Sequence, residues 1–211
     1  MSTFKLRSAA FPRLEVDVHE GHFATRTCHK SHYLDVTPIK HDHLLAREAA
    51  MALAGQYAWY HNIDTIVCMD GSEVIGAFLA RHIAKKDPIS VNQDKNIYVV
   101  SPEYDINHQM IFRENLIPLI RGKDVLVLIS TVNSGTTARR ALDTVRYYGG
   151  NPQGVTSIFS TLKEVEDFPV FSLFAPEDIP GYFLSPAGSC PACAAGQKLA
   201  AIINSYGFSA L

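Results

Sequence analysis

Apolar residues follow their most regular pattern between residues 124 and 150. Val125 to Ile129 form an uninterrupted apolar run, which is typical of a strand buried on both faces of a parallel sheet. A small polar turn follows at 133–137, and apolar residues then recur at helical spacing from Ala138 to Tyr148. The pattern therefore predicts a strand, a tight turn and a helix, in that order.

Strand-like and helix-like patterns alternate along the rest of the chain. Short apolar runs predict strands at residues 14–18, 33–36, 65–69, 96–100, 154–159 and 168–174. Helical spacing predicts helices at residues 43–60, 74–85 and 194–206. This alternation predicts an α/β fold, with a mainly parallel sheet flanked by helices and a small irregular hood from the terminal segments. We divide the chain into an N-terminal cap at 1–40 and an α/β core with a C-terminal helix at 41–211.

Residues 101–123 connect two of the predicted strands and have only a weak pattern. The segment is polar at first and is long enough to form a mobile excursion over a site. An edge hairpin explains its composition equally well, so the sequence leaves both structures open.

The polar turn at 133–137 has the composition of an anion site. Its backbone N–H groups and the first unpaired donors of the following helix converge, and the helix dipole adds partial positive charge there. Gly135 permits close approach, and Ser134 and Thr136 add hydroxyl donors. An ordinary helix cap is the alternative, because serine and threonine are preferred at caps in any protein. Asp70-Gly71-Ser72-Glu73 forms a second turn between strand and helix, and both turns should face one pocket at the carboxyl ends of the strands.

Composition and charge exclude several classes of protein. The 211 residues are 47% hydrophobic and 19% charged, and the formal net charge is -2. These values suit a folded domain, and they give neither a disordered chain nor a basic footprint for direct nucleic-acid binding. No apolar run reaches the length of a membrane span, and residues 1–18 lack a signal-peptide core. We expect a cytoplasmic protein that binds no membrane.

The four cysteines are too few for a disulfide framework. Cys190 and Cys193 have metal or redox spacing, but a structural zinc site needs about four ligands and the chain has no second such pair. His29 or Cys28 would have to complete the site through the fold. The histidine pairs at 29/32 and 41/43 lack the spacing of a helical metal site. The sequence therefore favours a turn with two thiols, and we assign no metal ligand.

Four segments, spread over nearly the whole chain, resemble the type I phosphoribosyltransferases, most closely the orotate phosphoribosyltransferase branch. VLVLISTVNSGTTARRAL occupies the place of the family's apolar strand and Thr/Ser-Gly-x-Thr phosphate loop, and DGSEVIGAFLA is similar to its pyrophosphate loop region. GHFATRTCHKSHYLD is similar to the N-terminal segment that contacts the base. The ending CPACAAGQKL resembles the CPLCxxGxPL ending of some members, which favours the family over a zinc site.

The resemblance implies a transferase of nucleotide metabolism, as in pyrimidine biosynthesis. Such an enzyme binds phosphoribosyl pyrophosphate with Mg²⁺, held mainly by the substrate's pyrophosphate, and joins a nitrogenous base to C1 of the ribose. It also implies a homodimer. Carried onto this sequence, the family's roles fall on phosphate-binding Asn133, Ser134, Gly135, Thr136 and Thr137, pyrophosphate-binding Asp70, Gly71, Ser72 and Glu73, ribose-binding Ser130, base-binding Arg26 and Tyr33, and catalytic His108 and Arg113.

The sequence also departs from the family at three places. Ile129 and Ser130 replace an acidic pair that hydrogen-bonds the ribose hydroxyls, and 158–161 lacks the arginine that pairs with a base carboxylate. His108 and Arg113 are the only candidates in the loop for facing pyrophosphate. Two hypotheses follow. One is a divergent transferase for a base other than orotate, and the other is a non-catalytic protein that binds a nucleotide or phosphoribosyl compound on the same scaffold.

Overall fold

The computed structural model describes residues 2–8, 11–57, 61–85, 90–107 and 109–211. Six strands of this described chain form the core sheet, in the order β10-β11-β9-β8-β4-β5, and all pairs except β10 with β11 are parallel. The mainly parallel α/β fold predicted from the sequence is therefore confirmed. The strands are β4 (Thr65–Cys68), β5 (Tyr98–Val100), β8 (Asp124–Val132), β9 (Asn151–Ser160), β10 (Glu164–Val165) and β11 (Phe168–Phe174).

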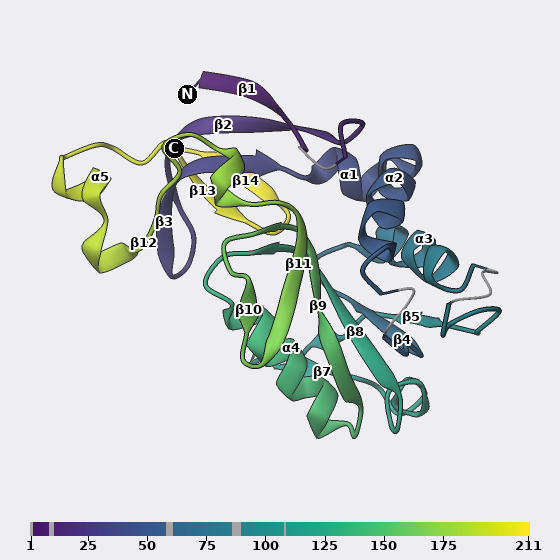
Figure 1. Cartoon of the computed structure of the whole chain (residues 1–211). Helices are drawn as coiled ribbons and strands as arrows, with labels where there is room; N and C mark the ends of the chain where they lie inside the picture. Colours follow the sequence, from purple (N-terminus) through teal and green to yellow (C-terminus); the bar gives the residue numbers. More distant parts are fainter. Residues whose placement is uncertain (1, 9–10, 58–60, 86–89, 108) are drawn as a thin grey trace.

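Helices cover both faces of this sheet (Figure 1). Successive side chains of a strand point to opposite faces, and β8 uses both. Leu126 and Leu128 belong to the hydrophobic cluster that includes α2 (His43–Ala54) and α3 (Glu73–Ile83). Val125, Val127 and Ile129 belong to the cluster that includes α4 (Thr136–Tyr147). The apolar run in β8 is thus explained by burial on both sides, as its pattern predicted.

A second sheet forms a hood beside the carboxyl ends of the core strands, and both terminal segments contribute to it (Figure 1). Its strands follow the order β12-β3-β2-β13-β14, and β1 pairs with β2. Short helix α1 (Thr37–His41) leads from the hood into the core. The hood strands are β1 (Ser2–Arg7), β2 (Glu15–Ala24), β3 (Cys28–Asp35), β12 (Leu184–Pro186), β13 (Ala201–Asn204) and β14 (Gly207–Ala210).

The C-terminal segment corrects one prediction. The helix predicted at 194–206 was wrong, because α5 (Pro191–Ala194) is a single turn and a hairpin follows it. Along β13 buried and exposed residues alternate, which is the period of a strand, and Asn204 accepts backbone hydrogen bonds from Tyr206 and Gly207 in the turn. Strands β12, β13 and β14 therefore belong to the hood sheet.

The connection at 101–123 forms a hairpin that stands apart from the core sheet. Its strands β6 (Glu103–Tyr104) and β7 (Met110–Ile111) pair only with each other within the described chain, and the turn η1 (Ile117–Leu119) leads into β8. Burial, followed by the charge of Asp70, raises the pKa of Tyr104 to about 12. The hairpin therefore lies close to the turn after β4. The helix predicted at 43–60 ends at Ala54, and residues 58–60 lie outside the described residues.

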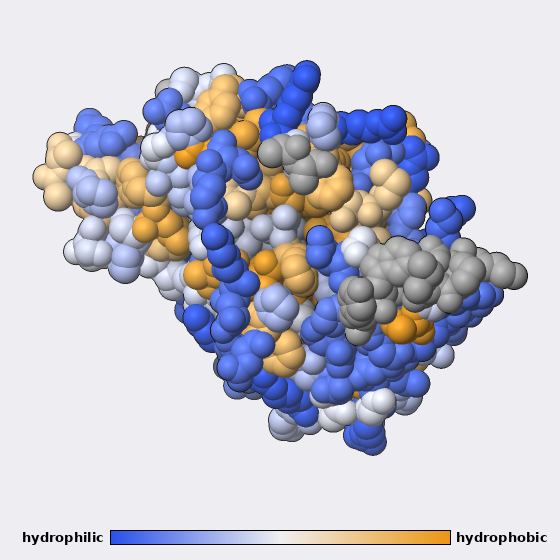
Figure 2. Space-filling view, viewed as in Figure 1, coloured by the Kyte–Doolittle hydropathy of each residue, from blue (hydrophilic) through white to orange (hydrophobic). Residues whose placement is uncertain are grey.

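The order of the core strands creates a crevice. The chain leaves β4 to form β5 on one side and later returns to form β8 on the other, so the connections after β4 and β8 diverge. Ligands of open α/β sheets bind at such switch points. Figure 2 shows apolar residues gathered where the hood lies over the core, while the lower part of the molecule is mostly hydrophilic. Among the described helices, none is long and apolar enough to cross a membrane.

Candidate functional site

A cavity of about 410 Å³ lies at this switch point, between the hood and the core. The loop after β8, the turn after β4 and the hairpin between β2 and β3 all contribute to its wall. The two turns therefore face one pocket, as predicted. Of the residues assigned to the site from the sequence, the cavity is lined by Asn133, Ser134, Gly135, Thr136, Thr137, Asp70, Arg26 and Tyr33.

The loop at 133–137 has the geometry of an anion cradle. Gly135 caps α4 with φ of 75°, a left-handed conformation that favours glycine, and within the described chain no side chain caps the helix. The first N–H groups of α4 therefore remain open toward the cavity. The hydroxyls of Ser134 and Thr136 lie 3.1 Å apart, and Arg139 donates to the Ser134 carbonyl over 3.1 Å. These bonds fix the loop without using its N–H groups.

Two buried side chains support the turn after β4 by hydrogen bonds to its backbone. Asp70 and Gly71 both have positive φ, 59° and 76°. The hydroxyl of Ser130 donates to the Asp70 carbonyl over 3.3 Å, so this buried side chain supports the turn and does not line the cavity. Lys40, only 2% exposed, donates from Nζ to the carbonyls of Asp70 and Ser205 over 2.9 and 2.8 Å. Lys40 therefore joins α1, the turn and the β13–β14 hairpin.

Within the turn, only Asp70 of the four predicted residues lines the cavity. Ser72 is buried and donates to the Leu128 carbonyl over 3.3 Å, while Glu73 accepts a hydrogen bond from Ser101 over 2.7 Å. Burial raises the pKa of Asp70, and a hydrogen bond from Ser205 and the charge of Lys40 oppose this effect. Desolvation dominates, so the ionised carboxylate destabilises the fold at neutral pH.

An Asp70→Asn variant is expected to be more stable than the wild type at pH 7, because the amide avoids the desolvation cost of the buried carboxylate. Asparagine has the same shape and tolerates positive φ. The folded pKa of Asp70 lies above the unfolded value of 3.8. The gain in unfolding free energy of the variant therefore vanishes below pH 3.8, grows between pH 3.8 and the folded pKa, and is constant at higher pH. Urea unfolding of both proteins across this range measures the difference, and a gain that persists unchanged at pH 3 would contradict the assignment.

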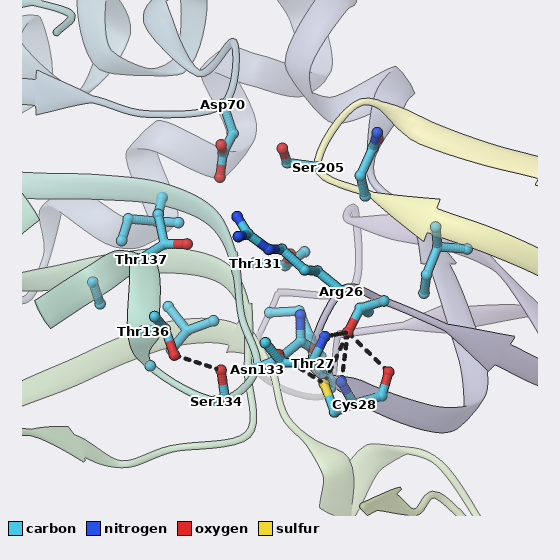
Figure 3. A pocket seen from close by; sticks show the side chains of 18 of the residues that line it. Arg26, Thr27, Cys28, Asp70, Thr131, Asn133, Ser134, Thr136, Thr137 and Ser205 are labelled. Atoms are coloured by element: carbon cyan, nitrogen blue, oxygen red, sulfur yellow. Dashed lines mark hydrogen bonds between the residues drawn. The ribbon is translucent and has the colours of Figure 1, made fainter. Parts of the chain in front are cut away.

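The hood side of the cavity carries positive charge and an aromatic ring. Arg26 is exposed at the tip of the β2–β3 hairpin, and Figure 3 shows its side chain reaching into the pocket near Asp70 and Thr131. Arg26 forms no ion pair within the described part of the chain. Lys30 is 4% exposed, and burial lowers its pKa to about 8. Burial likewise raises the pKa of Tyr33 to about 12, and the His19 ring stacks on it.

The structure places only one of the two predicted catalytic residues, Arg113. His108 lies outside the described residues. Arg113 is not among the lining residues, and its guanidinium donates to Glu103 over 2.7 and 2.9 Å. Ile129 and Ser130 stand where the family has its acidic pair, and of these two only the apolar Ile129 lines the cavity. The next lining residue of β8 is Thr131.

Sequence reasoning missed several residues of the site or its support, among them Lys30, Lys40, Thr131, Arg140 and Ser205. Strand alternation could have identified Thr131, two positions beyond the lining Ile129. Arg140 is one turn into α4, and helical spacing from Thr136 could have placed it on the same face. No local signal marks Lys40 or Ser205, because each reaches the site through tertiary packing of the hood.

No known family model matches the sequence, and no curated protein sequence matches it. Solved structures do match. The orotate phosphoribosyltransferase of Mycobacterium tuberculosis H37Rv, in complex with 5-phospho-alpha-D-ribosyl 1-diphosphate, superposes with a TM-score of 0.51 at 16% identity, over 69% of this chain and 82% of that chain. The UMP synthase of Leishmania donovani gives 0.53 at 12% identity, over 76% and 34%. The adenine phosphoribosyltransferase of Leishmania donovani gives 0.50 at 13% identity, over 72% and 73%.

These likenesses confirm the predicted fold. The chain has the type I phosphoribosyltransferase fold, and orotate phosphoribosyltransferases are among the structures it resembles. At these identities the likeness concerns the fold, so the chemistry has to be argued from the residues of the cavity.

Proposed function

We propose that the chain binds a phosphoribosyl compound in this cavity and transfers the phosphoribosyl group from phosphoribosyl pyrophosphate to a nitrogenous base. The observation that carries the proposal is the joint lining of one cavity by an anion cradle, an acidic turn and a basic, aromatic hood. These three parts correspond to the three parts of the reaction: the 5′-phosphate, the pyrophosphate and the base.

In this proposal the 5′-phosphate binds at residues 134–137, where open N–H groups and hydroxyls converge. The pyrophosphate points toward the Asp70 turn, and the base lies against Arg26 and Tyr33 of the hood. The bond between ribose C1 and the pyrophosphate oxygen breaks, and a bond from C1 to a base nitrogen forms. The transition state is loose and resembles an oxocarbenium ion, so the protein contributes mainly by positioning the groups and neutralising charge.

The donor set around the cavity fits Mg²⁺ that is carried by the substrate. Mg²⁺ typically uses one or two carboxylates together with phosphate oxygens and water. Asp70 is the one carboxylate among the described residues of the cavity wall, and it would hold the ion together with the ligand's pyrophosphate. The ion would neutralise charge on the departing pyrophosphate.

Arg113 can serve the reaction only after leaving Glu103. Both side chains of this pair are more than half exposed, and exposed ion pairs contribute about 0–1 kcal/mol. Exchange of Glu103 for a pyrophosphate oxygen therefore costs little. We also propose that the chain forms a homodimer, which sedimentation velocity of the purified protein would test.

One observation favours a second candidate, a non-catalytic protein that senses a nucleotide or phosphoribosyl compound. Ile129 lines the cavity where a carboxylate would bind the ribose hydroxyls, so the hold on the ribose is weaker. The hydroxyl of Thr131 is the nearby polar group on the same strand. Phosphate binding survives such a loss better than catalysis does.

Calorimetric titration separates the two candidates. We expect phosphoribosyl pyrophosphate to bind in the presence of Mg²⁺ more tightly than ribose 5-phosphate, followed by pyrophosphate release when the right base is added. Binding restricted to ribose 5-phosphate and nucleoside monophosphates, with no turnover of any base, would support the sensor. Binding of none of these ligands would contradict both candidates.

A further inference from the structure

Four metal-binding side chains meet at the far end of the hood, outside the cavity described above. They are His22 of β2, His29 of β3, and Cys190 and Cys193 at the two ends of the α5 turn. Each offers one ligand atom, and the four atoms lie within 4.8 Å of one another. We propose that these four residues form a structural zinc site that fastens the C-terminal segment to the β2–β3 hairpin.

The distances between the ligand atoms match a tetrahedral zinc site. Zinc bonds of about 2.3 Å to sulfur and about 2.0–2.1 Å to nitrogen give tetrahedron edges of about 3.3–3.8 Å. Here Nε2 of His22 and Nδ1 of His29 are 3.1 Å apart. Sγ of Cys190 lies 3.4 Å from the His22 nitrogen, and Sγ of Cys193 lies 3.7 Å from it and 3.3 Å from the His29 nitrogen. Four edges thus agree to within a few tenths of an ångström before any ion is placed.

The surrounding hydrogen bonds orient the ligands. Nδ1 of His22 lies 2.9 Å from the carbonyl of Gln197. A carbonyl only accepts, so Nδ1 carries the proton and the lone pair of Nε2 faces the centre of the cluster. The buried hydroxyl of Ser185 lies beside the thiol of Cys190, and Ser185 lies opposite His29 in the β12–β3 register. It is placed to donate to a thiolate of the cluster.

The backbone also brings the histidines together. The β2–β3 register shifts between Glu20 and Phe23, and this bulge makes His22, Phe23 and Ala24 consecutively buried. A regular strand would point alternate residues outward, so the bulge turns His22 toward the cluster. The partner of His29 in the register is Ala24, at the closed end of the hairpin. Two thiolates balance the charge of Zn²⁺, and the exposed side chain of Cys193 leaves the ion a route from solvent.

The site has a consequence for the cavity, because the hairpin that it fastens carries Arg26 and Thr27 at its tip. Thr25 and Cys28 close this tip through a 2.8 Å backbone hydrogen bond. Figure 1 shows α5 in a lobe beyond β12 and β3, which a bound ion would attach to the hood. The sequence favoured a turn with two thiols because the two histidines that complete the set come from a distant hairpin.

Metal content of the full-length chain tests the proposal. Protein purified without chelators is expected to contain about one zinc ion per chain, measured by plasma mass spectrometry. Cys193→Ser and His29→Gln should each lose most of this zinc, while the controls Cys68→Ser and His19→Gln, outside the cluster, should keep it. Full zinc content in both cluster variants would overturn the proposal.

Cobalt substitution provides a second measurement that needs no variant. Metal-free wild-type protein titrated with Co²⁺ should show the intense visible bands of a tetrahedral ion and thiolate charge-transfer absorption, saturating at about one equivalent. Chelation should also lower the thermal midpoint of the wild type and leave that of Cys193→Ser unchanged. A chain that takes up neither metal, or whose Cys190 and Cys193 are joined in a disulfide after anaerobic purification, would overturn the proposal.

Discussion

A Gly135→Val variant is expected to bind ribose 5-phosphate and phosphoribosyl pyrophosphate at least about 100-fold more weakly than the wild type. Gly135 has φ of 75°, a conformation that is strained for a β-branched residue. A Cβ at this position would also lie 2.8 Å from Cδ1 of Leu162, so either that side chain or the loop has to shift, and the backbone strain at Gly135 favours a shift of the loop. A shifted loop moves the N–H groups at the start of α4 away from the 5′-phosphate. Loss of two charge-assisted hydrogen bonds to that phosphate costs about 3–6 kcal/mol of binding free energy. Calorimetry with both ligands measures the loss.

Gly122→Val is the matched control for this variant. Gly122 also has positive φ, 67°, but a Cβ there would meet open space, and the residue lies at the opposite end of β8. The control should lose stability through backbone strain while keeping its affinity for both ligands. Equal affinities of Gly135→Val and Gly122→Val would refute the phosphate cradle. A melting curve shows that each variant is folded before the titration.

Local patterns were sufficient for the elements that build the phosphate end of the cavity. The apolar run in β8, the small residues at 133–137 and the spacing of α4 lie within one continuous segment, so periodicity and turn chemistry define them together. The same holds for β4 and the Asp70 turn. Hydrophobic burial on both faces of the sheet made these patterns unambiguous.

The hood could not be predicted in the same way, because its sheet joins segments nearly 200 residues apart. Ile202 and Ile203 suit a helix or a strand in isolation, and pairing of β13 with β2 decides between them. From the sequence alone, Lys40 is indistinguishable from a surface lysine. The fold buries it and provides two backbone carbonyls that accept hydrogen bonds from its ammonium group. The partners of Cys190 and Cys193 are equally remote in sequence, which is why the zinc ligands emerge only from the structure.

Arg26→Ala is expected to reduce the affinity for a nucleoside monophosphate by about 10–100-fold and to leave the affinity for ribose 5-phosphate unchanged. The guanidinium comes from the hood and reaches into the cavity (Figure 3). Its loss removes a charge-assisted contact of about 1.5–3 kcal/mol to the base end of the ligand only. Calorimetric titrations with the two ligands isolate this contribution, because they share the 5′-phosphate and differ in the base.

Arg7→Ala provides the control for charge. Arg7 is also an exposed hood arginine, but it pairs with Glu15 on β1 and β2, so its removal should affect neither ligand. Equal losses for both ligands in Arg26→Ala would place the guanidinium on the phosphate and contradict its assignment to the base. Zinc removal provides an independent comparison, because it should loosen the hairpin that carries Arg26. Like Arg26→Ala, it should lower the affinity for the nucleoside monophosphate and leave the affinity for ribose 5-phosphate unchanged. The two perturbations together would show that hood and cradle hold opposite ends of one ligand.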